Sequence, residues 1–148
     1  MLSQDFKEFV ELLNRYEVEY LIVGGYAVGI HGHPRYTGDL DIWIHATVEN
    51  ARKTLRALND FGFASFGLNE ADLTKLGNVI QMGYPPFRID ILTRIDGVDF
   101  EDCYRNKVII QYDGIVLYVI GVSDLMVNKR ASGRLKDIDD LENLKHIE

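Results

Sequence analysis

The hydrophobic positions of the chain follow two kinds of spacing, one typical of helices and one typical of strands. After Ser3, apolar residues recur every three or four positions, which predicts a helix that extends to about Tyr16. A similar stretch predicts a helix that ends at Gly62, and Ser123 is the expected N-cap of a later one. Helices are expected over residues 4–16, 26–31, 48–61, 69–77, 99–106 and 123–132, with a last helix that follows Gly133 and ends near Ile147.

Alternating or continuous apolar runs predict the strands. They lie at residues 20–23, 39–44, 79–82, 87–92, 108–112 and 115–120. Asp113-Gly114 joins the last two runs, and this dipeptide between β-rich segments is a strong hairpin signal. Helices that flank a mixed sheet without strict β-α-β alternation indicate an α+β fold. No linker or internal repeat divides the chain, so we expect one domain over residues 1–148.

The composition is that of an ordinary globular protein. Hydrophobic residues make up 47% and charged residues 26% of the 148 residues. No apolar run reaches the ~20 residues of a membrane span, and the first residues lack the pattern of a signal peptide. Cys103 has no second cysteine to pair with, so we expect a cytoplasmic protein. The net charge of −7 argues against sequence-specific DNA binding, which usually requires a basic face.

Two aspartates are expected on one face of the strand over 39–44. Asp39 and Asp41 are two residues apart, so their side chains point the same way, whereas the alternating apolar residues, beginning with Leu40, point toward the core. Adjacent carboxylates repel each other unless solvent or a cation intervenes. Mg²⁺ prefers hard oxygen ligands, usually one or two carboxylates together with substrate phosphates and water. The pair is therefore a candidate magnesium site.

A third carboxylate and a glycine pair extend this candidate site. Asp90 interrupts another apolar strand, and it would join the same face if the two strands are neighbours. Three carboxylates can hold two metal ions ~3.5–4 Å apart, which stabilise the attacking and leaving oxygens of an in-line displacement. Gly24-Gly25 follows a buried strand and precedes a helix, an arrangement in which backbone N–H groups can approach a phosphate closely.

Together these segments resemble the signature of a known superfamily. The run Ile22-Val23-Gly24-Gly25, followed after thirteen residues by Asp39-Leu40-Asp41, is similar to the motif of the DNA polymerase β-like nucleotidyltransferases, and Asp90 matches their third carboxylate. More narrowly, the chain resembles the small bacterial AbiEii and DUF6036-type nucleotidyltransferases, some of which are toxins of toxin–antitoxin systems. The matching segments are His31-Gly32, Arg35-Tyr36-Thr37 and the tail from Leu125 to Asp137, and the whole resemblance covers residues 23–141.

The resemblance implies a fold, an activity and particular site residues. The fold would be a minimal nucleotidyltransferase fold with a C-terminal helix pair. The activity would be the Mg²⁺-dependent transfer of a nucleoside monophosphate from a triphosphate such as ATP to an acceptor hydroxyl, with two metal ions and with Mn²⁺ as a substitute. The residues implied are Asp39, Asp41 and Asp90 as catalytic metal ligands, Gly24 and Gly25 at the triphosphate, and Arg35, Thr37 and Lys129 as further nucleotide contacts.

The acceptor stays open at the level of sequence. Its hydroxyl could belong to the 3′ end of an RNA, to a protein or to a small molecule, and a toxin would have an antitoxin protein as its partner. The main alternative is a catalytically silent module that binds a nucleotide or a partner on the same fold. Taken singly, the Asp pair is as typical of a solvated strand end, and the basic tail as typical of a salt-bridged helix pair.

Overall fold

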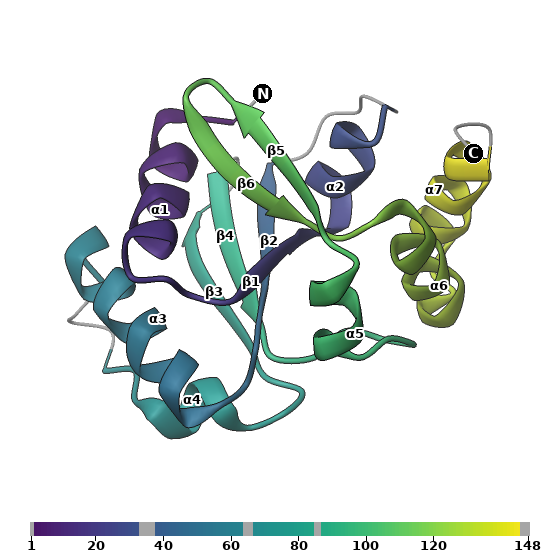
Figure 1. Ribbon diagram of the computed structural model, residues 1–148. Coiled ribbons are helices and arrows are strands. Elements are labelled where there is room, and N and C mark those ends of the chain that lie inside the picture. Colours follow the sequence, from purple (N-terminus) through teal and green to yellow (C-terminus); the bar gives the residue numbers. More distant parts are fainter. Residues whose placement is uncertain (1, 33–37, 64–66, 85–86, 146–148) are drawn as a thin grey trace.

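A mixed six-stranded sheet forms the centre of the molecule, with helices on both of its faces (Figure 1). The computed structural model describes residues 2–32, 38–63, 67–84 and 87–145. The strands are β1 Tyr20–Val23, β2 Asp39–Ile44, β3 Val79–Tyr84, β4 Phe87–Leu92, β5 Val108–Tyr112 and β6 Ile115–Val119. The helices are α1 Gln4–Arg15, α2 Gly24–Ile30, α3 Val48–Phe61, α4 Glu70–Thr74, α5 Phe100–Arg105, α6 Val122–Ser132 and α7 Leu135–Lys145. The predicted α+β fold with a C-terminal helix pair is confirmed.

The strand order places the candidate site at the middle of the sheet. The order is β3-β4-β2-β1-β6-β5, with β2 parallel to β4, β1 parallel to β6 and the other neighbours antiparallel. In this register Asp41 of β2 lies beside Asp90 of β4 on one side and Val23 of β1 on the other. Cross-strand partners share a face of the sheet, so the end of β1 and the carboxylates of β2 and β4 meet there.

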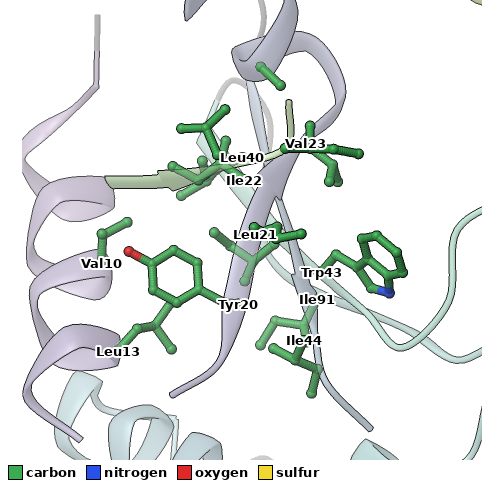
Figure 2. Close-up of a cluster of buried hydrophobic side chains, with 14 of the residues drawn as sticks. Val10, Leu13, Tyr20, Leu21, Ile22, Val23, Leu40, Trp43, Ile44 and Ile91 are labelled. Carbon is green, nitrogen blue, oxygen red and sulfur yellow. The ribbon is translucent and has the colours of Figure 1, made fainter. Parts of the chain in front are cut away.

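The two faces of β2 have different surroundings. Leu40, Ile42 and Ile44 are fully buried, as the alternating pattern predicts. On this face Tyr20 of β1 points toward α1, whereas Trp43 projects from the opposite side of the sheet (Figure 2). Burying each aliphatic side chain contributes about 1.5–3 kcal/mol, so the apolar face fixes which way the alternate aspartates of the same strand must point.

Local signals set most of the helix ends. The Ser3 hydroxyl accepts a hydrogen bond from the Phe6 backbone N–H at 3.2 Å at the start of α1, and α3 ends at Gly62 with φ 105°. The prediction for Ser123 was wrong, because α6 begins at Val122 with Gly121 as its N-cap. None of the helices in the described ranges is both long and apolar enough to cross a membrane.

Candidate active site

Three carboxylates lie on the face of the sheet that carries Trp43. Asp39 and Asp41 come from β2, and Asp90 of β4 is the register partner of Asp41. The Asp39 side chain is 40% exposed and that of Asp90 is 9% exposed, so the group extends from solvent into the protein. The predicted meeting of the three residues on one face is therefore observed. Their role as metal ligands stays a prediction.

A guanidinium lies between two of these carboxylates. Arg88 Nη2 donates to Asp39 Oδ2 at 2.9 Å and to Asp90 Oδ2 at 3.1 Å, and Arg88 Nε donates to Asp90 Oδ1 at 2.9 Å. The hydrogen bonds that Arg88 donates to Asp90, together with the charge of Asp90, raise the pKa of Arg88, with smaller contributions from the charges of Asp39 and Asp41. Sequence reasoning did not select Arg88, although its position two residues before Asp90 on one strand places both on one face.

The chemistry of this group fits a divalent cation. The three aspartates offer only hard oxygen donors, the ligands that a divalent cation such as Mg²⁺ prefers, and adjacent carboxylates repel each other unless a cation lies between them. Among the described residues, no three His, Cys, Asp or Glu side chains already converge as a metal site. Arg88 instead donates hydrogen bonds to Asp39 Oδ2 and to both oxygens of Asp90.

Gly24 packs directly against one of the carboxylates. It is the first residue of α2 and has φ +67°, a conformation that residues with a Cβ rarely adopt. A Cβ at this position would lie 2.1 Å from Asp41 Oδ2, far closer than any real contact. The turn after β1 can therefore approach Asp41 only because it lacks a side chain. Gly25 is buried within α2.

The Gly24→Ala variant tests this close approach. We expect it to lower the free energy of unfolding by about 2 kcal/mol, because left-handed backbone costs an alanine roughly 1–2 kcal/mol and Asp41 must also move. Nucleotidyl transfer should fall with the displacement of Asp41. Urea denaturation and initial rates measure the two effects.

Gly29→Ala is the matched control within the same helix. A Cβ at Gly29 meets nothing within 4 Å, so this variant should be neutral or more stable by up to ~1 kcal/mol. If Gly24→Ala unfolded at the same urea concentration as the wild type and kept full activity, the proposed contact with Asp41 would be wrong.

A cavity of about 310 Å³ opens beside Asp41. Its volume is at the lower end of the range for small-molecule sites. It lies between the sheet, the segment after β4 and the C-terminal helices. The lining residues are Val23, Gly24, Asp41, Leu92, Arg94, Ile95, Asp96, Asn128, Lys129, Ser132 and Arg134. Two arginines and a lysine thus surround the same space as Asp41 and Gly24.

Lys129 is held by a buried ionic cluster at the edge of this cavity. Its side chain is 3% exposed, and its Nζ lies 2.9 Å from Asp137 Oδ1 and 3.2 Å from Asp140 Oδ2, both on α7. Burial alone would raise the pKa of Asp137, but hydrogen bonds from Arg134, Lys129 and Ser132 outweigh it and lower the pKa to about 2. The ammonium therefore joins α6 to α7, and the predicted nucleotide contact of Lys129 stays a prediction.

Arg134 is the most exposed cation of this cluster. Its side chain is 69% exposed, its Nε donates to Asp137 Oδ2 at 2.6 Å, and it lines the cavity together with Asp41. The hydrogen bond to Asp137 raises the pKa of Arg134, with a smaller contribution from the charge of Asp41. Arg35 and Thr37, the other two predicted nucleotide contacts, lie outside the described residues.

A second cavity, of about 530 Å³, adjoins the first and shares Arg94 and Ile95 with it. Three carboxylates, those of Asp99, Asp102 and Asp124, line it together with the thiol of Cys103. Burial, reinforced by Asp124, raises the pKa of Cys103 to about 12. The thiol is therefore protonated at neutral pH and does not act as a nucleophile.

Comparison with known proteins gives one family match and several similar folds. A family model described as a nucleotidyltransferase of unknown function, DUF6036, matches residues 1–148. No curated protein matches the chain significantly.

Three solved structures share the fold. The lincosamide antibiotic adenylyltransferase LnuA, solved with lincomycin, superimposes with a TM-score of 0.59 at 15% identity, covering 100% of this chain and 99% of LnuA. A Thermotoga maritima protein described as a nucleotidyltransferase gives 0.56 at 14% identity, with 94% and 87% coverage. An antigenic nucleotidyltransferase-like protein from Paracoccidioides brasiliensis gives 0.54 at 18% identity, with 97% and 77% coverage.

Proposed function

The chain belongs to the DUF6036 family of nucleotidyltransferases, and on this basis we propose that it transfers a nucleoside monophosphate from a nucleoside triphosphate to an acceptor hydroxyl in a Mg²⁺-dependent reaction. The observation that carries the proposal is the register of β2 and β4, which brings Asp90 beside Asp41 next to the Gly24 turn. Three carboxylates beside a turn that has no side chain suit phosphoryl-group transfer. In such reactions, positioning and charge neutralisation provide most of the rate enhancement.

The proposed roles follow from the positions of the side chains. Asp39, Asp41 and Asp90 would hold divalent cations, which supply charge neutralisation at the triphosphate and lower the pKa of the acceptor hydroxyl. The open turn at Gly24 leaves room for phosphate oxygens beside Asp41. The acceptor hydroxyl would lose its proton to Asp90 or to solvent as its oxygen forms a bond to the α-phosphorus. The bond from that phosphorus to the bridging oxygen would then break, and pyrophosphate would leave with those electrons. Arg134, which is exposed and lines the same cavity as Asp41, would pair with that leaving group.

The second cavity supports a small acceptor. It adjoins the first through Arg94, and its volume suits a small molecule. Three carboxylates and one arginine would repel the phosphates of an RNA end, attract a positively charged compound and admit a neutral one. LnuA, which has the same fold, is an adenylyltransferase of a small molecule, a lincosamide.

A toxin role with an antitoxin partner remains a prediction. Cytoplasmic localisation and the single domain also remain predictions.

A labelling experiment tests the proposed function. Purified protein is incubated with Mg²⁺, each α-³²P-labelled nucleoside triphosphate in turn and a cell lysate separated into RNA, protein and small-molecule fractions. We expect label in the small-molecule fraction and release of pyrophosphate with the wild type, and neither with Asp39→Asn. Label in RNA or protein would show that the acceptor is not a small molecule, whereas the proposed transferase activity would stand. Nucleotide binding by calorimetry with no labelled product in any fraction would instead favour the silent binding module.

A further inference from the structure

Arg88 lies between Asp39 and Asp90 and donates hydrogen bonds to both. Its guanidinium crosses from β4 to Asp39 on β2 and also holds both oxygens of Asp90 on its own strand, in three hydrogen bonds of 2.9–3.1 Å. Only 26% of the Arg88 side chain and 9% of the Asp90 side chain are exposed. A planar, always charged guanidinium suits such a bidentate contact, and partial burial strengthens it. The site therefore already contains one cation of its own.

A metal ion at these aspartates must compete with that cation. Arg88 donates to Asp39 Oδ2 and to both oxygens of Asp90, which are two of the three carboxylates that would hold a divalent ion. A guanidinium and a metal ion also repel each other at short distance. Because the guanidinium and the metal ion would be bound to the same carboxylates at short distance, their repulsion favours the loss of at least one Arg88 contact when the metal binds.

We propose that Arg88 is the resident counter-cation of the metal-free site and that its displacement limits metal binding. Without metal, the guanidinium keeps the carboxylates of two neighbouring strands from repelling each other. When metal binds, the contact with Asp39 is the one to break, since it is a single hydrogen bond to the more exposed carboxylate. Arg88 is thus a positioning residue that sets the affinity of the site. This inference rests on the proposed function, because it assumes that the aspartates bind a divalent cation.

Titration with Mn²⁺ in the absence of nucleotide tests the inference. Free Mn²⁺ is measured by electron paramagnetic resonance for the wild type and for Arg88→Met, which keeps an unbranched stem but removes the guanidinium and its charge. We expect Arg88→Met to bind Mn²⁺ about tenfold more tightly, because charged hydrogen bonds no longer have to be broken. The metal-free variant should also melt at a lower temperature than the wild type, and Mn²⁺ should raise its melting temperature more.

Two further variants make the result specific. Arg88→Lys keeps the charge but loses the bidentate contact, so it should bind Mn²⁺ with intermediate affinity, and it serves as the test if Arg88→Met does not fold. Arg52→Met removes an exposed arginine that pairs with Glu70 at 2.7 Å and should leave the Mn²⁺ affinity unchanged.

The outcomes separate this inference from the proposed function. If the wild type binds Mn²⁺ and Arg88→Met binds it equally or more weakly, the competition is refuted while the metal site stands. If neither the wild type nor any Arg88 variant binds Mn²⁺, the metal site of the proposed function fails and the inference fails with it. Binding that appears only in Arg88→Met supports the inference strongly.

Discussion

The Asp41→Asn variant is expected to lose nucleotidyl transfer by about 10³-fold while keeping its fold. Asp41 is the central carboxylate of the site, because Asp90 lies beside it in the sheet and the Gly24 turn packs against its Oδ2. Asparagine keeps the shape of the side chain but removes the charge that would hold a metal, and metal-ion stabilisation of the reacting phosphate is worth several kcal/mol. Initial rates with a labelled triphosphate measure the loss. Thermal unfolding should change little, because asparagine keeps the shape of the side chain.

Asp113→Asn provides the matched control for that variant. Asp113 lies at the turn of the β5–β6 hairpin with φ 51°, where it pairs with Lys7. Asparagine tolerates this conformation, so the same chemical change there should leave the transfer rate within twofold to threefold of the wild type. If the Asp41→Asn variant transferred nucleotide at the wild-type rate, the three carboxylates would not have the proposed role in the reaction.

Local sequence signals predicted the elements of the fold but not their order in the sheet. Periodicity and turn chemistry act over a few residues, which is why the hairpin at Asp113-Gly114 and the helix end at Gly62 were found. The parallel pairing of β1 with β6, through Ile22 and Val119, joins distant parts of the chain and leaves no local pattern. The start of α2 was missed by two residues, because the glycines expected in a turn form its first turn.

The sequence predicted the site residues whose position depends only on which face of a strand they occupy. It did not predict the contacts that depend on how separate elements pack together. Alternation along β2 and β4 placed the aspartates on one face, given that the strands are neighbours. The contact of Arg88 with Asp39 depends on the register between those strands, which no spacing within either strand reveals. The burial of Lys129 depends likewise on how α6 packs against α7. The sequence alone left the basic tail open between a nucleotide contact and a salt-bridged helix pair, and the structure shows ion pairs between α6 and α7.

The Lys129→Met variant is expected to lower the free energy of unfolding by about 3–5 kcal/mol. Asp137 and Asp140 are fully buried, and removing the ammonium that contacts both leaves two buried carboxylates without a counter-charge that they share. Methionine preserves most of the side-chain volume, so the loss reports the charge. Urea denaturation at pH 7 measures it, with Arg130→Met as the control, because Arg130 is the next residue of α6 and is exposed.

The dependence of stability on pH gives a second, independent measure of the same cluster. The pKa of Asp137 is lowered from 3.8 to about 2, so its ionised form contributes stability that is fully present above about pH 4 and is lost as the pH falls toward 2. In the wild type this loss should be on the order of 2 kcal/mol. In Lys129→Met the pKa of Asp137 should lie closer to its ordinary value, and the loss over this pH range should shrink. If Lys129 instead only contacted the nucleotide, the free energy of unfolding of the variant would equal that of the wild type at every pH. The two proteins would then differ only in nucleotide affinity.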